Sequence, residues 1–297
     1  MLDKDSRDFY RKKFNEKASF EKKFNSNVVH LDTSDTQWNE RFRTSLVDML
    51  RKEGILEDTA ADLKNLHNLI DKKYFICGET KGTNNNSRPI ISDIGFKFLD
   101  SNFDLYLDFL RFIYKEVIKE DFYFQASPTI RFHVPEYNKH LTLPAWHCDV
   151  ILGHPPAEMN IWLSLTDNSR SDFWIGDMDN SRQWLEEYDF DFTAWKNICF
   201  SNNPDFNKKG FSFCKEVENI GSRIFLFDSR CIHAATYRGP SDLTTKVSID
   251  LRVILKKDYE WVEINNRPLY IGDGIKKAEF RPGHEFGYFS KSIEELM

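Results

Sequence analysis

The sequence lacks several features that would each place it in a large class of proteins. No run of apolar residues approaches the roughly 20 that a membrane-spanning helix needs. Basic residues do not dominate, because 41 Lys and Arg stand against 47 Asp and Glu, a formal net charge of -6. A surface of that sign argues against general nucleic-acid binding. The glycine-rich phosphate-binding patterns G-x-x-x-x-G-K-[ST] and G-x-G-x-x-G do not occur either.

Cysteine is scarce and unpaired in pattern. The chain has five cysteines, an odd number, and none forms a C-x-x-C pair. The opening stretch MLDKDSRDFYRKKF has no apolar segment of the signal-peptide kind, and no prenylation cysteine stands at the C-terminus. These features predict a protein of a reducing compartment, and we expect it in the cytoplasm.

The first part of the chain carries helical patterns. Hydrophobic residues make up 40% of the sequence and include 26 Phe, so 297 residues suffice for a large aromatic core. Apolar residues recur at steps of three and four over 34–54, again over 63–70, and over a longer stretch at 103–117. We therefore predict that residues 1–120 form a helical region packed on the rest of the molecule.

The pattern changes after Asp121, where prolines separate short runs rich in β-branched and aromatic residues. Seven runs have the length and the boundaries of strands: 129–134, 146–152, 159–165, 222–227, 231–237, 246–255 and 260–264. So many short strands are typical of a sandwich or a jelly roll. We expect a mainly β core over 121–297, continuous with the helices as one domain and broken by a long insertion at about 168–215.

His147 and Asp149, in AWHCDVIL, are the most informative residues. Alternate side chains of a strand project from the same face, so these two would lie side by side. His233, in SRCIHAAT, offers a third ligand 86 positions later. Two imidazoles and one carboxylate are the facial triad of non-haem Fe(II) oxygenases, which leaves coordination positions open for other ligands. The H-x-D alone also occurs by chance in surface turns.

Residues on the neighbouring predicted strands could complete a pocket. In the run KVSIDLR, alternation places Lys246 and Arg252 on one polar face, opposite an apolar face. Such a stripe is either an interior wall or a wet outer face. Asn160 and Trp162 share a face of their strand and could supply an amide donor and an aromatic wall, although Trp162 could equally be ordinary core packing. Arg131 could face the same pocket or form a surface ion pair.

In these segments the sequence resembles the Fe(II)- and 2-oxoglutarate-dependent dioxygenases, in particular the branch with phytanoyl-CoA hydroxylase, the StrG-like proteins and the Kdo hydroxylases. The matching segments are RFHVPE (131–136), the stretch 146–167 and the stretch 222–252, so the resemblance covers roughly the C-terminal half and none of the first 120 residues. It implies a cupin-like double-stranded β-helix, a form of jelly roll, flanked by helices.

Carried over to this chain, the resemblance makes His147, Asp149 and His233 the Fe(II) ligands. It implies 2-oxoglutarate as co-substrate and O2 as oxidant, with hydroxylation of a substrate C–H bond and release of succinate and CO2. By position, Lys246 would pair with the distal carboxylate of 2-oxoglutarate, where many relatives carry Arg. A Lys ammonium cannot make the planar two-bond contact of a guanidinium, so Arg252 remains a competing anchor.

The resemblance indicates a polar small-molecule substrate, such as a carbohydrate or an antibiotic-pathway intermediate. The acids and aromatics of the predicted insertion would suit such a ligand, but they are also what a solvated helix with buried aromatics shows. Neither a nucleic-acid nor an integral membrane partner is expected, and the pattern does not give the oligomeric state.

Two other functions are compatible with the same residues. One is a cupin-like metal- or sugar-binding jelly-roll module without oxygenase activity. The other is a zinc hydrolase, because two His and a carboxylate also suit zinc. An inward basic residue separates the candidates, since a 2-oxoglutarate enzyme needs a cation for the distal carboxylate and a zinc hydrolase does not.

Overall fold

Two antiparallel sheets face each other at the centre of the molecule. The computed structural model describes residues 2–57, 62–71, 97–98, 101–125, 128–133, 146–152, 154–167, 171–199, 201, 203–218, 222–235, 244–259 and 291–297. The six-stranded sheet has the order β1 (Val28–Asp32), β7 (Arg223–Asp228), β4 (Met159–Ser164), β9 (Lys246–Leu255) and β2 (Phe122–Phe124), and β3 (Thr129–His133) also pairs with β9. The three-stranded sheet has the order β6 (Cys214–Glu216), β5 (Phe173–Gly176) and β8 (His233–Ala235).

The path of the chain between the sheets identifies the architecture. After β3 in the large sheet, His147 bridges to His233 at the edge of the small sheet. The chain then enters the large sheet at β4, the small sheet at β5 and β6, the large sheet at β7, the small sheet at β8 and the large sheet at β9. This alternation between two facing antiparallel sheets is that of a double-stranded β-helix, a jelly roll. The expected fold class, mainly antiparallel sheet with flanking helices, is confirmed.

Several predicted strands have the expected place, and others do not. The run 246–255 is β9 from end to end, and the runs 129–134, 159–165 and 222–227 are each within one residue of β3, β4 and β7. The run 231–237 is reduced to the three residues of β8 within its described part, and 260–264 lies outside the described residues.

The prediction of a strand over 146–152 is wrong. In that stretch only His147 pairs with another strand, and a 3-10 turn, η4 (Asp149–Leu152), follows at once. The sequence pattern misled here because a short buried turn and a short buried strand are both continuous apolar runs.

The stretch 168–215 is more than an insertion. It begins with β5 and its last residues lie in β6, so it supplies two of the three strands of the small sheet. Between them lie three helices, α7 (Met178–Glu186), α8 (Phe192–Cys199) and α9 (Pro204–Phe213). The side chains of Asp177 and Asn203 cap the first and last of these by accepting hydrogen bonds from backbone N–H groups of the first turn.

The remaining helices lie mostly in the N-terminal part of the chain. Their bounds are α1 (Lys4–Asn15), α2 (Ser19–Phe24), α3 (Trp38–Lys52), η1 (Leu63–Asn65), α4 (Leu66–Leu69), α6 (Phe103–Phe112) with a π turn η3 (Ile113–Ile118), and η5 (Glu294–Leu296). The three helical patterns of the sequence correspond to α3, to η1 with α4, and to α6 with η3. The same part of the chain also contributes β1, which the pattern missed, to the edge of the large sheet.

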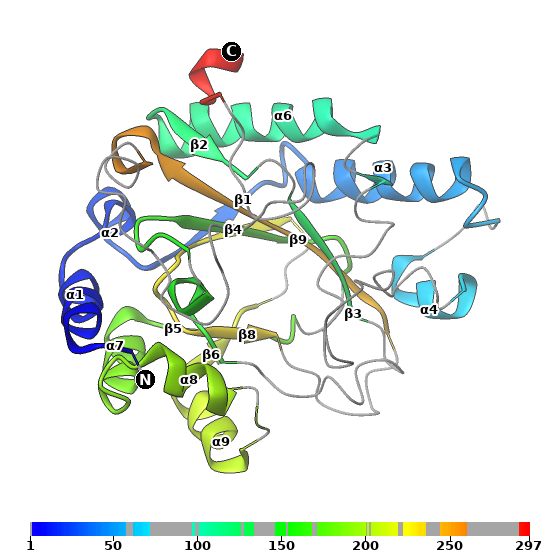
Figure 1. Ribbon diagram of the computed structural model, residues 1–297. Coiled ribbons are helices and arrows are strands. Elements are labelled where there is room, and N and C mark those ends of the chain that lie inside the picture. The colour runs from blue at the N-terminus through cyan, green and yellow to red at the C-terminus, as the bar shows by residue number, and fades with distance from the viewer. Residues whose placement is uncertain are drawn as a thin grey trace.

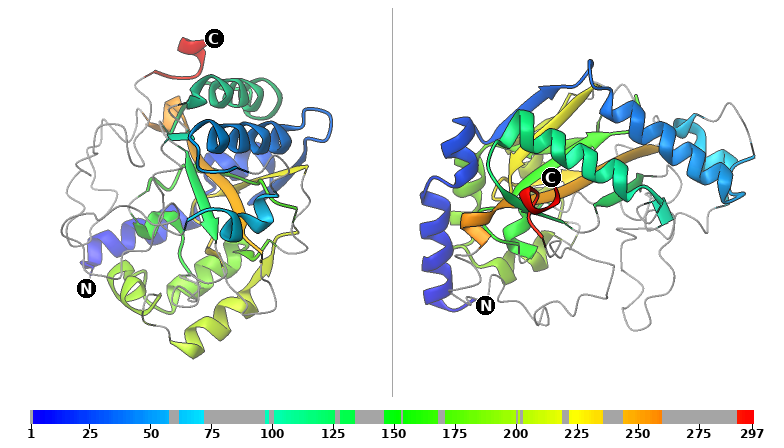
Figure 2. Two further views of the ribbon diagram at one scale, coloured as in Figure 1. Left: turned by 90° about the vertical axis from the view of Figure 1, so that its right-hand side faces the viewer. Right: turned by 90° about the horizontal axis from the view of Figure 1, so that it is seen from above.

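Helices cover the outer face of each sheet (Figure 1). The helices α3 and α6 lie side by side over the large sheet, as both views of Figure 2 show, and Trp38 and Phe42 of α3 pack on Phe109 of α6 at ring-centroid distances of 5.3 and 5.4 Å. The helices α7, α8 and α9 lie beyond the small sheet. In the part of the chain that the structure describes, no helix is both long enough and apolar enough to cross a membrane.

The two faces of β9 separate the outer core from the interior. Val247, Ile249 and Leu251 belong to the core that the large sheet shares with α3 and α6. The alternate residues, Lys246, Ser248, Asp250 and Arg252, face the other way, toward the space between the sheets. The polar stripe of the sequence is therefore an interior wall.

Candidate metal centre

Three potential metal ligands converge at one end of the space between the sheets. Asp149 Oδ1 lies 3.8 Å from His147 Nε2 and 3.8 Å from His233 Nε2. One ligand atom from each residue can be chosen so that all three lie within 4.8 Å of one another. The Asp149 side chain is fully buried, whereas 22% of the His147 side chain is exposed, so the group is reached from the imidazole side. These residues could hold a metal ion.

Backbone hydrogen bonds hold the three ligands in register. The N–H of His147 donates to the carbonyl of His233 at 3.0 Å, and the N–H of His233 donates back at 2.8 Å. The N–H of Asp149 donates to the carbonyl of Ser229 at 3.0 Å, at the turn that precedes β8. The ligands therefore depend on pairing between segments that are more than 80 residues apart.

The helices beyond the small sheet fix the segment that carries His147. The indole N–H of Trp195 in α8 donates to the carbonyl of Trp146 at 2.8 Å. The Trp146 ring is fully buried and packs against Trp184 of α7 and Phe211 of α9. The aromatics of the predicted insertion are thus largely core, and they position a ligand.

The hydrogen bonds of the triad leave its metal-facing atoms available. Asp149 Oδ2 accepts from Nε of Arg252 at 2.9 Å, while Oδ1 is buried and has no hydrogen-bond partner among the described residues. His233 Nδ1 lies 3.0 Å from the carbonyl oxygen of Cys231, which assigns the ring proton to Nδ1 and the lone pair to Nε2. A buried carboxylate oxygen without a partner is costly unless a cation or donor meets it. The three residues therefore fit a divalent metal.

The protonation states favour metal binding as well. Burial by itself would raise the pKa of Asp149, but the Arg252 guanidinium, helped by His233, holds that pKa well below its ordinary value. Burial lowers the pKa of His233, against the opposing pull of Asp149. An ionised carboxylate and a neutral imidazole are the forms that ligate a metal.

Arg252, which contacts Asp149, belongs to a buried cluster of polar side chains. Arg252 Nη1 donates to Oε1 of Gln125 at 3.4 Å, and Arg252 Nε lies 3.9 Å from Oε2 of Glu158. The same Glu158 oxygen lies 3.0 Å from Nδ1 of His154. The sequence pattern did not single out Gln125 or Glu158. No local pattern marks them, because they meet Arg252 only through the pairing of the sheets.

The residues proposed for the pocket wall face the same interior. In the register of β4 and β9, Asn160 lies opposite Arg252 and Trp162 lies opposite Asp250. The Trp162 ring stacks on Phe173 at a centroid distance of 5.3 Å, and Phe173 in turn lies 5.7 Å from the His233 ring. The amide nitrogens of Asn160 and Gln125 are buried and have no hydrogen-bond partner within the described ranges.

The basic residues of the stripe are all engaged with carboxylates. Arg131 makes a two-bond contact with Asp250, with Nε and Nη2 donating at 2.9 Å each. Arg252 contacts the ligand Asp149, whereas the Lys246 ammonium donates to the carboxylate of Asp172. The two candidate anchors for 2-oxoglutarate, Lys246 and Arg252, therefore have different partners although they lie only six residues apart on β9.

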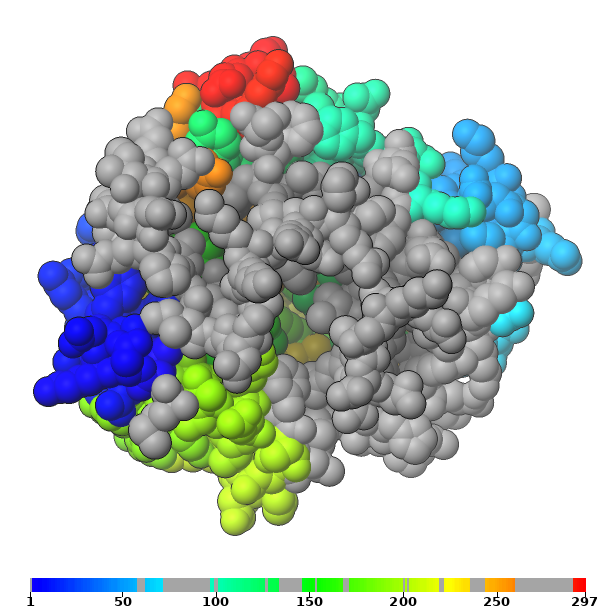
Figure 3. All heavy atoms as spheres, in the orientation of Figure 1, coloured from blue at the N-terminus to red at the C-terminus, as the bar shows by residue number. Residues whose placement is uncertain are grey.

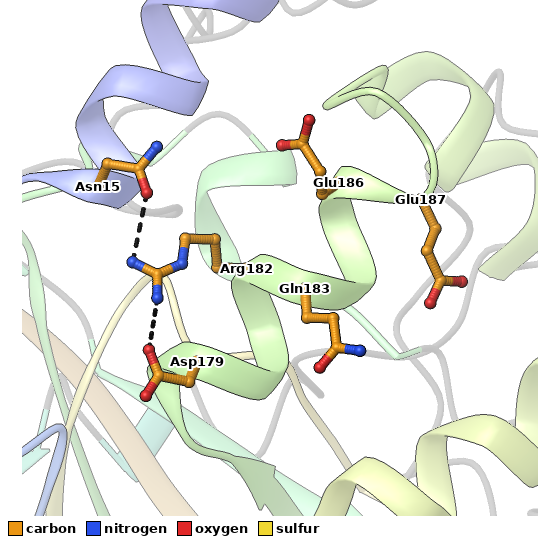
Figure 4. A pocket seen from close by; sticks show the side chains of 6 residues that line it. All are labelled: Asn15, Asp179, Arg182, Gln183, Glu186 and Glu187. Atoms are coloured by element: carbon orange, nitrogen blue, oxygen red, sulfur yellow. Dashed lines mark hydrogen bonds and ion pairs between the residues drawn. The ribbon is translucent and has the colours of Figure 1, made fainter.

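The surface of the molecule is hollowed in more than one place. Figure 3 shows a hollow in one face of the molecule with green and gold atoms of the central strands at its floor. A separate depression of about 680 Å³ lies between α1 and α7 and includes Asn15, Asp179 and Arg182 (Figure 4). Arg182 donates to both of these neighbours, and Glu186 at the same depression accepts from Arg11. Its charges thus join α1 to α7.

The chain is similar, at low sequence identity, to several solved structures. EctD from S. alaskensis with bound Fe is 10% identical over 86% of this chain and 81% of that chain, with a TM-score of 0.44. The non-heme alpha ketoglutarate dependent carbocyclase SnoK from nogalamycin biosynthesis is 15% identical over 85% and 84%, with a TM-score of 0.35. HygX from Streptomyces hygroscopicus with nickel and 2-oxoglutarate bound is 9% identical over 80% and 85%, with a TM-score of 0.35.

No protein-family model and no curated protein matches the sequence. We therefore base the functional assignment on the strand topology and the triad of this chain.

Proposed function

We propose that the protein is an Fe(II)- and 2-oxoglutarate-dependent dioxygenase that hydroxylates a C–H bond of a polar small molecule, with release of succinate and CO2. The observation that carries the proposal is the buried Oδ1 of Asp149, which has no hydrogen-bond partner in the described part of the chain and faces Nε2 of both His147 and His233 at the end of a double-stranded β-helix. Fe(II) and 2-oxoglutarate would supply the oxidising chemistry.

The residues of this chain would bind and orient the reactants. His147, Asp149 and His233 would hold the iron, and Arg252 would keep the Asp149 carboxylate ionised and fixed. Lys246 would neutralise the distal carboxylate of 2-oxoglutarate. The amide nitrogens of Asn160 and Gln125, which have no hydrogen-bond partner among the residues that the structure describes, would donate to co-substrate or substrate oxygens. The Trp162–Phe173 stack would form an apolar wall that excludes water.

We also propose the finer assignments of the resemblance: a phytanoyl-CoA hydroxylase-like branch, a substrate such as a sugar or natural-product intermediate, and a cytoplasmic location. The interior charges support a substrate without strong net charge, because Arg131 pairs with Asp250 and Lys246 pairs with Asp172. A wall whose described charges are paired in this way offers hydrogen bonds to hydroxyl-rich molecules.

The test is an anaerobic titration of the protein with Fe(II) and then with 2-oxoglutarate. We expect the weak visible charge-transfer absorption of a bidentate keto-acid complex, followed by succinate formation when oxygen is admitted. His147→Ala should lose iron binding and both signals while keeping its thermal unfolding transition. His30→Ala, at an exposed position of the edge strand β1, removes an imidazole outside the triad and is the matched control; it should keep iron binding, the absorption and succinate formation. Bound iron without the absorption would instead favour a binding module or a zinc-type hydrolase.

A further inference from the structure

Lys246, which we propose to bind the distal carboxylate of 2-oxoglutarate, already contacts the carboxylate of Asp172. Lys246 begins β9 in the large sheet, and Asp172 directly precedes β5 in the small sheet, so the pair crosses the interior of the jelly roll. Both side chains are largely buried, with 12% of Lys246 and 7% of Asp172 exposed.

The pair lies within reach of the metal ligands along the strands. Ile175 of β5 is the register partner of His233, and Asp172 stands three residues before it. That is roughly 10 Å at the rise of a β-strand. The intervening Phe173 contacts the ring of His233. A dicarboxylate that starts at the triad and runs along β5 would therefore arrive with its far end near this pair.

The turn before β5 holds Asp172 in place. Its φ is 52°, in the left-handed region that residues with a side chain seldom adopt. Its N–H donates to Oε1 of Glu216 at 3.1 Å, and the preceding Ser171 hydroxyl donates to the carbonyl of Val217. The carboxylate is thus held against Lys246 by contacts with the strand on the other side of β5.

Among the described residues, the two cations of this region, Arg131 and Lys246, each pair with a carboxylate of the protein. Arg131 is matched by Asp250 and Lys246 by Asp172. Burial, with Arg131 and Lys246 nearby, lowers the pKa of His133 to about 4, so this neighbour is neutral at physiological pH. A carboxylate that approaches Lys246 would meet a like charge in a buried setting, where such repulsion is strong.

We propose that Asp172 is an internal competitor for Lys246: its carboxylate occupies the ammonium group that would bind the distal carboxylate of 2-oxoglutarate, and so sets the co-substrate affinity. This inference rests on the proposed function. Co-substrate binding would require Lys246 to exchange or share its carboxylate partner. Asp172 is then a specificity-determining residue that keeps the site closed to weak carboxylate ligands.

The test is the same anaerobic titration of the iron-loaded protein, with Asp172→Asn in place of the wild type. The amide keeps the shape of the side chain and removes its charge. The 2-oxoglutarate concentration at half-saturation should therefore fall by about tenfold, because one like charge next to the buried anion has been removed. The affinity for Fe(II), measured separately by metal titration, should not change. Asp167→Asn is the matched control, because that exposed carboxylate pairs with Arg43 on the same β4–β5 connection. It should leave both affinities unchanged.

Lys246→Arg with Asp172 left in place keeps the proposal testable if Asp172→Asn does not fold. Its planar fork can contact two carboxylates at once, so this variant alone should bind 2-oxoglutarate more tightly than the wild type. Adding Asp172→Asn to it should then give a smaller gain than adding Asp172→Asn to the wild type.

The outcomes separate the two proposals. One outcome is that the wild type shows the charge-transfer absorption and Asp172→Asn binds 2-oxoglutarate equally or more weakly. That outcome would overturn the competitor role and leave the dioxygenase proposal standing. Equal gains with Lys and with Arg at position 246 would do the same. No band in either protein, with iron bound, would overturn both proposals.

Discussion

Replacing Arg252 with Met should destabilise the protein much more without metal than with it. The Arg252 guanidinium is 6% exposed and bonds to the fully buried Asp149 at 2.9 Å. Removal of one partner of a buried ion pair costs about 3–5 kcal/mol, because the other charge stays behind without compensation. Against a total stability of roughly 5–15 kcal/mol, this is a large loss for the metal-free variant.

A bound divalent cation would change that result. It would supply positive charge at Asp149 Oδ1, the oxygen that has no partner among the described residues. The metal should therefore stabilise Arg252→Met by more than it stabilises the wild type, through its preferential binding to the folded state. The assay is urea unfolding at neutral pH, with chelator and with saturating Co(II) or Fe(II).

The pH dependence gives a second check on the same variant. In the wild type the low pKa of Asp149 contributes stability above the ordinary carboxyl range, and that stability is lost as the pH falls. Without Arg252, burial would raise this pKa, and the carboxyl would escape part of the penalty by taking up a proton. The loss of stability in metal-free Arg252→Met should therefore shrink as the pH is lowered.

The matched control is Arg230→Met. Arg230 and Asp228 form another fully buried pair, at 2.7 Å, but their charges do not contact the triad. The Arg230→Met variant should lose the same amount of stability with and without metal. Arg252→Lys keeps the charge and should lie between the wild type and Arg252→Met. The reasoning is refuted if the metal rescues Arg230→Met as well as Arg252→Met, or if it rescues neither.

Three further substitutions test separate parts of the structure. Gly210→Ala would place a Cβ 2.1 Å from a ring atom of Trp146. We therefore expect the free energy of unfolding, measured with denaturant, to fall by about 1–3 kcal/mol, and iron binding to weaken. A variant as stable as the wild type would contradict the packing. His133→Gln should flatten the acid side of the stability profile, because a pKa of about 4 in the folded state makes the wild type lose stability as the pH falls from the ordinary value of 6.5 toward 4; thermal unfolding at pH 7 and pH 4.5 measures this. Asn160→Ala should raise the 2-oxoglutarate concentration at half-saturation several-fold without changing iron affinity, and an unchanged value would exclude its amide from the site.

Local sequence patterns predict much of the fold. The alternation of β9 identified both its ends and its two faces, because one side packs on helices and the other lines the interior. The periodicity of α3 was equally clear. The two short strands of the small sheet, β5 and β6, were missed, since a few residues among acids and aromatics carry no period that distinguishes them from the helices between them.

The sequence by itself determined the candidate ligands, because the two imidazoles and the carboxylate of the H-x-D motif and His233 are a known metal-binding set. It did not determine the local shape, since His147 and Asp149 meet through a single bridge and a turn instead of a continuous strand. The partners of the two interior cations were decided by the tertiary structure alone. Arg252 bonds to a carboxylate 103 residues away and Lys246 to one 74 residues away. Strand register and the facing of two sheets select these partners, and local sequence encodes neither.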